Sequence, residues 1–337
     1  MKINEFDYYL PPELIAQEPP KKRGYSRLLV VDRKKRIFEE KIFNEIIEYL
    51  NPGDLIVFNN TKVIKARLFG KLPNGRKGEI LLLRKIGENI WEALSRPAKK
   101  MKEGTVLKID NYEIKICERK KEGIRIIQFL NANDKEVIEK YGNIPLPPYI
   151  KNPDVKENDY QTIFAAKEGA VAAPTAAFHF TPDLIEKIKA KGVKISFLTL
   201  HCSLGTFRPI KTENIEEHQM YYEDYEISEE LVKSVEEVKK ENKRVIACGT
   251  TVVRALESQM KELGKLVSGY YSTNLFIYPP FKFQIVDALI TNFHLPKSTL
   301  LLLVCAFADK ELIFQAYQYA IEKKFHFYSF GDAMFII

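Results

Sequence analysis

The sequence predicts an α/β protein in which helices flank a mostly parallel sheet and a small all-β barrel is inserted into the chain. Strand, turn and helix patterns alternate after residue 180, which is typical of a parallel sheet covered by helices. Residues 66 to 127 differ, because short strands there alternate with turns that contain Gly and Lys. The 337 residues suffice for two domains of about 150 residues each. We therefore expect a discontinuous α/β domain at 1–65 and 151–337 and a barrel domain at 66–150.

The segment before the insertion contains three expected strands and one expected helix. The first strand, 28–31, turns through a charged segment into a second strand that begins at Ile37. Residues 43–50 have helical spacing and stop at a Pro-Gly breaker. A short apolar strand at 55–58 then enters the polar loop Asn59-Asn60-Thr61.

Within the insertion, apolar runs predict short strands at 79–83, 91–95, 106–109, 112–116 and 124–129. The insertion closes at 144–150, where three prolines favour an extended connection.

After the insertion, capping residues mark the helices. Thr181 and Pro182 predict the start of a helix that ends before Gly192, and Ser228 and Ser298 begin two more. Strands are expected at 193–200, 244–248 and 285–290, with a helix at 252–258.

Charge is unevenly distributed along the chain. Residues 62 to 125 hold 18 Lys and Arg against 8 Asp and Glu, a local excess of +10 in a chain of net charge +7. This indicates either a surface for a polyanion or the ordinary solvated surface of a lysine-rich protein.

Several classes of protein find no support in the sequence. The longest apolar run, 300–308, is far shorter than the ~20 residues that span a bilayer. The first residues lack the features of a signal peptide and the four cysteines form no close pair, so we expect a cytoplasmic protein with reduced thiols. The five histidines show no metal-binding spacing, so we expect no metal. There is no G-x-S-x-G elbow of a hydrolase, and Lys297-Ser298-Thr299 lacks the upstream glycines of a P-loop.

Polar segments follow three of the expected parallel strands, at 201–208, 249–251 and 291–299. Ligands bind beyond the carboxyl ends of strands in such sheets, so these segments are candidates for one site, together with residues 173–180. Each also has a plainer interpretation. Gly249-Thr250-Thr251 can be a tight turn, and His179, between two phenylalanines, can be a core histidine.

A series of motifs occurs in order along nearly the whole chain. They are Phe6-Asp7-Tyr8, Asn59-Asn60-Thr61-Lys62-Val63, Ser95-Arg96-Pro97-Ala98, Ala173-Pro174-Thr175 through His179-Phe180, Gly249-Thr250-Thr251 through Arg254 and Glu257, Thr273-Asn274-Leu275-Phe276-Ile277, Asp287-Ala288-Leu289-Ile290-Thr291-Asn292-Phe293-His294-Leu295-Pro296 with Ser298-Thr299-Leu300, and Ser329-Phe330-Gly331-Asp332-Ala333-Met334. With these motifs the chain resembles the S-adenosylmethionine:tRNA ribosyltransferase-isomerase family of queuosine biosynthesis.

The resemblance implies an α/β domain with an inserted barrel and a metal-free tRNA-modifying enzyme. The expected substrate is a tRNA that carries 7-aminomethyl-7-deazaguanine at the wobble position. The ribosyl group of S-adenosylmethionine is transferred to the aminomethyl nitrogen and rearranged, which gives epoxyqueuosine and releases adenine and methionine. S-adenosylmethionine is thus a co-substrate, and no tightly bound cofactor is expected.

The chemistry needs a base beside the sulfonium and a proton donor for adenine, and histidine titrates in the right range. The candidates, whose roles stay unranked, are His179, His201 and His294, with Asp287 or His218 as orienting partners. Expected contacts to the donor are Thr175, Phe178, Phe180, Gly205, Thr206, Gly249, Thr250, Thr251, Asn274, Asn292 and Phe293. The amides of 249–251 would bind the methionine carboxylate at a helix N-terminus.

A wobble base lies in a single-stranded loop and can be splayed into a pocket. Expected RNA contacts are Arg67, Arg76, Lys77, Arg96, Lys99, Lys100, Arg208 and Arg254. Three positions depart from the glycines usual in the family, namely Ala177, Leu204 and Pro280, which puts the local shape of the pocket in question.

Two competing functions stay open at the level of sequence. A catalytically decayed tRNA-binding relative would bind tRNA without releasing adenine. An ordinary S-adenosylmethionine methyltransferase would need a glycine-rich loop after an early strand, which this chain lacks.

Overall fold

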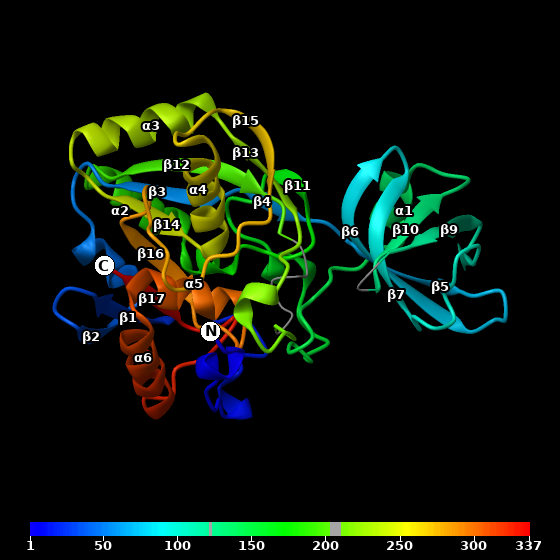
Figure 1. Ribbon diagram of the computed structural model, residues 1–337, viewed down its shortest axis with the longest axis horizontal. Coiled ribbons are helices and arrows are strands. Elements are labelled where there is room, and N and C mark those ends of the chain that lie inside the picture. Colours follow the sequence, from blue (N-terminus) through cyan, green and yellow to red (C-terminus); the bar gives the residue numbers. More distant parts are fainter. Residues whose placement is uncertain (121–122, 203–209) are drawn as a thin grey trace. The chain divides into compact units, whose positions relative to one another are not determined.

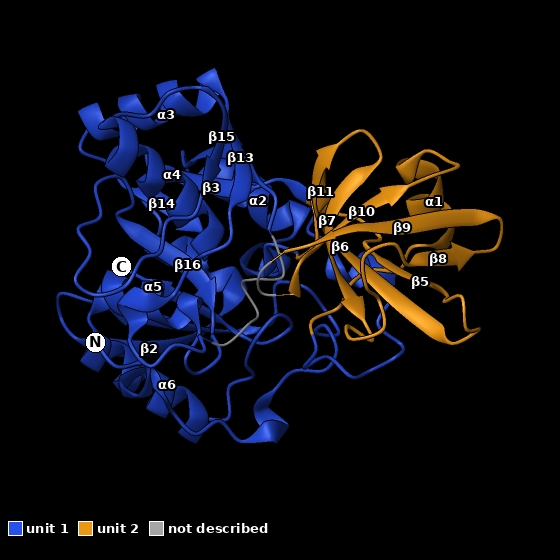
Figure 2. Cartoon of the chain, turned by 45° about the vertical axis from the view of Figure 1, so that its right-hand side comes forward, with its two compact units in different colours: residues 1–61, 148–167, 173–337 blue, residues 62–147, 168–172 orange. Residues whose placement is uncertain are grey.

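The computed structural model describes residues 1–120, 123–202 and 210–337, and this part of the chain forms two compact units. Unit 1 comprises Met1–Thr61, Pro148–Lys167 and Ala173–Ile337, and unit 2 comprises Lys62–Pro147 and Glu168–Ala172 (Figure 2). Unit 1 is an α/β structure and unit 2 a closed β-barrel, which confirms the predicted fold class. That 66–150 folds as an independent domain stays a proposal.

A nine-stranded sheet runs through the described part of unit 1, in the order β15-β13-β12-β3-β14-β16-β17-β1-β2 (Figure 1). The strands are β1 Arg27–Asp32, β2 Ile37–Ile42, β3 Leu55–Asn59, β12 Lys194–Leu200, β13 Glu223–Ile227, β14 Val245–Cys248, β15 Gly269–Thr273, β16 Ala288–Asn292 and β17 Ala333–Ile336.

The sheet is mixed, with a parallel centre. β12, β3, β14 and β16 are mutually parallel, as the alternation of strands and helices predicts. β13, β15 and β2 add antiparallel edges, and β17 lies antiparallel to β16 but parallel to β1. The sequence patterns did not predict β13, β15 or β17, so the antiparallel share of the sheet is a finding of the structure.

The described helices of unit 1 are α2 Pro182–Ala190, α3 Glu229–Lys240, α4 Thr250–Leu263, α5 Thr299–Ala308 and α6 Lys310–Glu322. Three of them, α2, α3 and α5, begin at the predicted caps, whereas α4 starts two residues before the expected position and α6 was not predicted. The side chains of Thr181, Ser228 and Ser298 each accept a bond from a backbone amide in the first turn. Short 3-10 helices connect them: η1 Ile3–Phe6, η2 Pro12–Leu14, η3 Phe43–Tyr49, η5 Glu157–Tyr160, η6 Thr175–His179 and η8 Ile215–Glu217.

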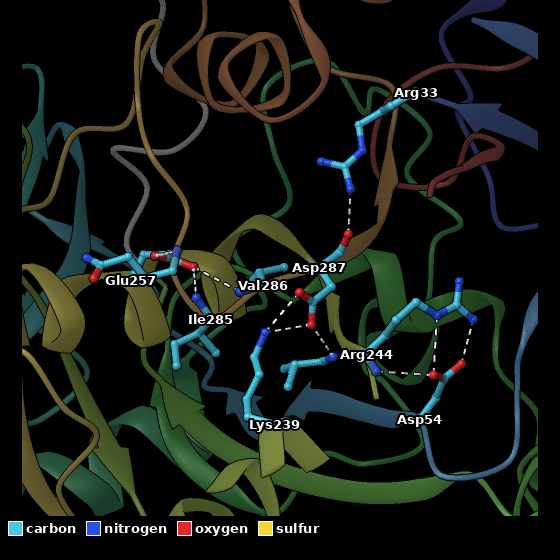
Figure 3. A network of polar contacts seen from close by, with 10 residues as sticks. Arg33, Asp54, Lys239, Arg244, Glu257, Ile285, Val286 and Asp287 are labelled. Carbon is cyan, nitrogen blue, oxygen red and sulfur yellow. Dashed lines mark hydrogen bonds and ion pairs between the residues drawn. The ribbon is translucent and has the colours of Figure 1, made fainter. Parts of the chain in front are cut away.

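Two expectations about elements were wrong in detail. Residues 43–49 form a 3-10 helix rather than an α-helix. The strand expected from Ile285 begins only at Ala288, because the Glu257 carboxylate accepts the amide hydrogens of Ile285 and Val286 (Figure 3). Those amides are therefore not available for pairing with a neighbouring strand.

The core follows from the alternation of side chains along β3. Ile56 and Phe58 join the fully buried cluster that includes Phe43, Phe180 and Leu184, on the face covered by η3, η6 and α2. Side chains alternate across a strand, so Leu55 and Val57 face the opposite side, where α3 and α4 lie against β3.

The amino ends of the parallel strands are joined by charged groups (Figure 3). The buried Asp54 carboxylate, at the start of β3, accepts from Arg244 Nη2 at 2.5 Å and from the Asn51 amide at 2.8 Å. Asp287, before β16, accepts from Lys239 Nζ at 2.7 Å and from the Val245 amide at 2.7 Å. These contacts fix how β3, β14 and β16 are aligned along the strand direction. They therefore also fix the positions of the carboxyl ends of these strands.

Unit 2 is a closed barrel in the order β10-β7-β6-β5-β8-β9. Its strands are β5 Arg67–Lys71, β6 Lys77–Gly87, β7 Ile90–Arg96, β8 Val106–Ile109, β9 Tyr112–Arg119 and β10 Arg125–Phe129, with helix α1 at Asp134–Tyr141. β4 Thr61–Val63 and β11 Lys167–Ala170 form a separate two-stranded sheet. β5 and α1 were not predicted from the sequence.

In the parts of the chain that the structure describes, no helix has the length and apolar character to cross a membrane. All four cysteines are free thiols, and Cys202, Cys248 and Cys305 are buried, as expected for reduced cysteines.

Replacing Asp54 by Asn should destabilise unit 1 by about 2–3 kcal/mol, because the half-buried Arg244 guanidinium loses its charged partner. Urea unfolding followed by circular dichroism measures the change. Glu237→Gln is the matched control, because its pair with Lys194 is exposed and should be worth less than about 0.5 kcal/mol. Equal losses in the two variants would contradict the assigned importance of the amino-end network.

Candidate active site

The carboxyl ends of the four central strands bring the predicted polar segments to one edge of the sheet. Asn59 ends β3, His201 follows β12, Gly249 follows β14 and Asn292 ends β16. These strands are parallel neighbours, so their ends meet at the same edge, where α/β proteins bind ligands.

Asn59 connects three of these segments. Its amide nitrogen donates to Leu200 O at 2.9 Å and to Thr251 Oγ1 at 3.3 Å. Its carbonyl oxygen accepts from the amides of Leu200 at 3.0 Å and Thr61 at 3.1 Å. The side chain is fully buried, so these bonds replace water completely and hold β3, β12 and α4 together.

Among the described residues, side-chain hydrogen bonding holds His201 through one ring nitrogen. Thr61 Oγ1 donates to the Lys167 carbonyl at 3.4 Å and lies 2.8 Å from His201 Nδ1. Nδ1 therefore carries the proton and donates to Thr61, which leaves Nε2 as an acceptor. No described residue forms a hydrogen bond with Nε2. Burial lowers the pKa of His201 from its ordinary value.

The N-terminus of α4 is an uncapped helix end at this edge. Gly249 adopts φ +99°, which a residue with a side chain rarely adopts, and its amide donates to Ile290 O at 2.8 Å. Gly249 supplies no capping side chain, and we find no partner in the described residues for the amides of Thr250 and Thr251. Such amides and the helix dipole favour an anion.

His179 lies in η6, which packs against the same edge. Thr175 Oγ1 donates to Asn292 Oδ1 at 2.8 Å, which turns the Asn292 amide nitrogen toward His179 Nε2 at 3.2 Å. Nε2 must therefore accept, and the proton on Nδ1 is donated to Ser26 Oγ at 2.7 Å. The ring also stacks on Phe43, with centroids 4.9 Å apart. Burial lowers the pKa of His179 to about 4, so the imidazole is neutral at pH 7.

His294 is enclosed by its own segment and by tyrosines. Its Nε2 lies 2.8 Å from Thr291 Oγ1. Its backbone amide donates to Tyr317 Oη at 2.9 Å, and its carbonyl accepts from Tyr8 Oη. Burial lowers the pKa of His294 to about 3. Of the three candidate histidines, His201 alone is partly exposed.

The three candidate aromatic residues differ in their surroundings. Phe180 packs edge-on against Phe43 and Phe58, and Phe293 packs among Tyr317, Phe325 and Phe327, so core packing accounts for both without a ligand. Phe178 stacks on Phe330 with centroids 5.9 Å apart, and the guanidinium of Arg23 lies over its ring.

Four further candidates have surroundings that bear on their expected roles. Asp287 is at the amino end of β16 and binds Lys239, so it does not orient the histidines at the carboxyl end. His218 packs against Phe276, and Asn274 is exposed beyond β15. Arg254 forms a buried ion pair with Glu223 and donates to Leu275 O at 3.1 Å, so this arrangement gives no support to the expected RNA contact.

The other residues predicted in the loop after β12 lie outside the described residues. They are Leu204, Gly205, Thr206 and Arg208. Ala177 lies in η6, outside the left-handed region, and its methyl group belongs to the core cluster, so the fold does not require glycine there. Pro280 is exposed.

Sequence reasoning missed Ser26, Asn59 and Thr61 as members of the site. Asn59 and Thr61 were recognised as a polar loop and as part of a family motif, but no role in the site was expected for them, although they lie at or just beyond the end of a strand of the parallel centre. Ser26 gives no sequence signal, because it approaches His179 across 153 residues of chain.

Five of the basic residues of unit 2 that were predicted to contact RNA are exposed, and one is half-buried. Arg76, Lys77, Arg96, Lys99 and Lys100 are exposed, whereas Arg67 is half-buried and lies 3.4 Å from Glu79. The turn that carries Lys99 and Lys100 is fixed from inside by the buried Arg125, which donates to the carbonyls of Ala98 and Met101.

A row of lysines crosses three strands of the barrel. Lys77 pairs with Lys71, and Lys71 pairs with Lys108, and all three are exposed. Like charges directly opposite each other destabilise a sheet, so an anionic ligand would stabilise this row. In the described parts of the chain, no three His, Cys, Asp or Glu residues form a group suited to a metal ion.

Comparison with known proteins gives full-length matches. The family model described as "Queuosine biosynthesis protein" matches residues 3–336. A Thermotoga maritima protein named S-adenosylmethionine:tRNA ribosyltransferase-isomerase is 51% identical over 340 residues, and one of the same name from Thermosipho melanesiensis is 52% identical over 337 residues. Each alignment covers 100% of both chains. The crystal structure of a Thermotoga maritima S-adenosylmethionine tRNA ribosyltransferase is similar, with a TM-score of 0.58, 42% identity and coverage of 99% of this chain and 100% of that one.

Replacing His179 by Gln should make the protein less sensitive to acid. Its pKa is about 4 in the fold against an ordinary 6.5, so between these values the unfolded chain binds a proton that the folded protein does not. Stability is therefore lost as the pH falls from about 6.5 to 4, by up to about 3 kcal/mol for this residue.

Urea unfolding of wild type and variant at about pH 7 and pH 4.5 measures this difference. His326→Gln is an informative contrast, because Asp332 raises the pKa of His326 and its loss should make the protein slightly more sensitive to acid. An unchanged pH dependence in His179→Gln would contradict the neutral, buried state.

Proposed function

The chain belongs to the queuosine biosynthesis family, and from this membership we propose that it acts as an S-adenosylmethionine:tRNA ribosyltransferase-isomerase. Identity of 51% over the whole length of a relative so named carries the proposal. The reaction moves the ribosyl group of S-adenosylmethionine to 7-aminomethyl-7-deazaguanine at the wobble position of a tRNA. It rearranges that group to give epoxyqueuosine and releases adenine and methionine. We place this reaction in the cytoplasm.

S-adenosylmethionine is the co-substrate, and its carboxylate is bound by the amides of Thr250 and Thr251, which have no partner among the described residues. An uncapped helix end favours an anion without a charged side chain. Phe178 offers an aromatic contact for the adenine or the sulfonium. Thr175 and Asn292 supply polar groups beside it, in an orientation fixed by His179.

His201 acts as the general base that removes a proton from the carbon beside the sulfonium. It is the partly exposed member of the three histidines, and its Nδ1–H bond to Thr61 presents an unprotonated Nε2. His179 has a different role, because both of its ring nitrogens are engaged. It positions Asn292 rather than exchanging protons.

The tRNA contacts the exposed lysines and arginines of unit 2. Arg76, Lys77, Arg96, Lys99 and Lys100 project into solvent. The row of Lys77, Lys71 and Lys108 adds to these exposed charges, although Lys108 also pairs with Glu113 at 3.1 Å and Lys77 lies over the ring of Phe69. Phosphates are the polyanion that such a surface fits.

The purified protein should release adenine and methionine from S-adenosylmethionine when it is given tRNA bearing the aminomethyl-deazaguanine, without added metal. Mass spectrometry detects both products and the ribosyl-derived mass gain of the tRNA, and tRNA that lacks the modified base is the control. S-adenosylhomocysteine and a methyl mass gain would instead identify a methyltransferase. Bound tRNA with intact donor would identify a catalytically decayed relative.

His201→Gln should lower kcat by about 10²–10⁴-fold at pH 7, which is the usual contribution of a general base. Burial lowers the pKa of His201, so the wild-type rate should hold down to below pH 6.5 and fall at lower pH. This acid limb should be absent from the residual rate of the variant. The matched control is His326→Gln, whose ring is 59% exposed and should change kcat little. A His201 variant that keeps both the rate and the acid limb would exclude His201 as the base.

A further inference from the structure

The loop of residues 21–26 is fastened to the site from two sides. Gly24 adopts φ +83°, and a Cβ atom there would lie 2.5 Å from Asn44 Oδ1, so the backbone approaches η3 as closely as glycine allows. The Gly24 carbonyl accepts from the Asn44 amide at 3.1 Å, and the Ser26 carbonyl accepts from the Phe43 amide at 2.9 Å. The loop is therefore a fixed part of unit 1.

Two residues of this loop contact η6, each in a different way. Ser26 is buried and accepts from His179 Nδ1, at one end of η6. Arg23 places its guanidinium 5.8 Å from the centre of the Phe178 ring, in the same short helix. Arg23 therefore lies beside the candidate active site, although its position in the sequence gives no sign of this.

The guanidinium of Arg23 forms no ion pair with a described residue, and burial lowers its pKa while the charge of Asp159 opposes that shift. Arg23 is half-buried, and its Nη2 donates to Gln161 O at 2.9 Å. Two other half-buried arginines of unit 1 are paired, Arg27 with Glu40 and Arg244 with Asp54, whereas Arg33, like Arg23, donates to backbone carbonyls. A guanidinium has five N–H donors, and burying its charge without an anionic partner costs free energy.

The exposed side of the loop continues the positive charge. Lys21 and Lys22 are exposed, and Tyr25 is 53% exposed with Lys22 Nζ lying 4.1 Å from its ring centre. A planar cation beside exposed lysines and an accessible ring is the combination that binds single-stranded nucleic acid, through phosphates and a base face.

We propose that Arg23 binds a phosphate of the RNA next to the nucleotide held in the active site, and that Lys22 and Tyr25 continue this contact along the strand. The proposal rests on the proposed function and adds to it an RNA-binding surface on unit 1. A phosphate supplies the negative charge that Arg23 lacks and can accept two parallel N–H bonds from the guanidinium. The carboxylate of S-adenosylmethionine is the competing anion, and the uncapped end of α4 already provides for it.

The test compares Arg23→Gln, Arg23→Lys and wild type, with tRNA binding measured over a range of salt concentrations and KM measured for both substrates. Arg23→Gln should raise the Kd for tRNA roughly tenfold, because one charge-assisted contact is lost. The slope of log K against log salt should fall by about 0.7, the value for one phosphate of a single strand. KM for S-adenosylmethionine should stay unchanged, and Arg23→Lys should recover part of the affinity.

Two further variants make the outcome specific. Arg36→Gln removes an arginine of unit 1 that lies near Asp309 and Glu311, and it should leave tRNA binding unchanged. Combined replacement of Lys99 and Lys100 by Gln should lower the salt slope independently of Arg23, if unit 2 also contacts the RNA. Circular dichroism and thermal unfolding establish that each variant is folded.

Three results would overturn the inference. A raised KM for S-adenosylmethionine with normal tRNA affinity would assign Arg23 to the donor carboxylate. No change in either substrate would leave Arg23 as a structural cation over Phe178. An unchanged salt slope in folded Arg23→Gln would exclude a phosphate contact, whatever the change in Kd. Failure of the proposed function would be visible separately, because wild-type protein would then release no adenine.

Discussion

The candidate active site depends on the buried carboxamide of Asn59. This one group accepts from two amides and donates to Leu200 O and Thr251 Oγ1, and so it joins the ends of β3 and β12 to the first turn of α4. It also fixes the backbone of Thr61, which holds His201. A buried amide group left without a partner costs about 1–3 kcal/mol, so movement of any one of these segments is opposed by the others.

The two edges of the central sheet are built differently. The amino ends of the strands carry ion pairs, with Asp54 bound to Arg244 and Asp287 bound to Lys239. At the carboxyl ends, burial keeps His179 and His294 uncharged at neutral pH, and the buried charges of Arg254 and Glu223 neutralise each other. Under the proposed function this difference has a reason, because the donor is a sulfonium cation that charged histidines would repel. The negative end of the donor is left to backbone amides at α4.

The number of arginines does not indicate how much positive charge this protein has available for binding a ligand. Arg125 is buried and binds backbone carbonyls, so it shapes the turn of Lys99 and Lys100 without contributing surface charge. Arg254 is neutralised by Glu223, and Arg33 donates to the carbonyls of Phe307 and Asp287. Arg23 differs because it lies over Phe178, beside the candidate site, and forms no ion pair with a described residue. The distinction lies in partners that are distant in the sequence.

The sequence by itself determined the fold class, the helix caps and the family. Apolar periodicity and capping residues act over a few positions, so Thr181, Ser228 and Ser298 could be identified locally, and the ordered motifs carried the resemblance. Only the tertiary structure decided which polar side chains meet. It brought Ser26 to His179 and Thr61 to His201, and it moved Asp287 and Arg254 into ion pairs away from their expected roles. The physical reason is that periodicity reports which face of an element is buried, whereas a site is made by strand order and register, which join residues more than a hundred positions apart.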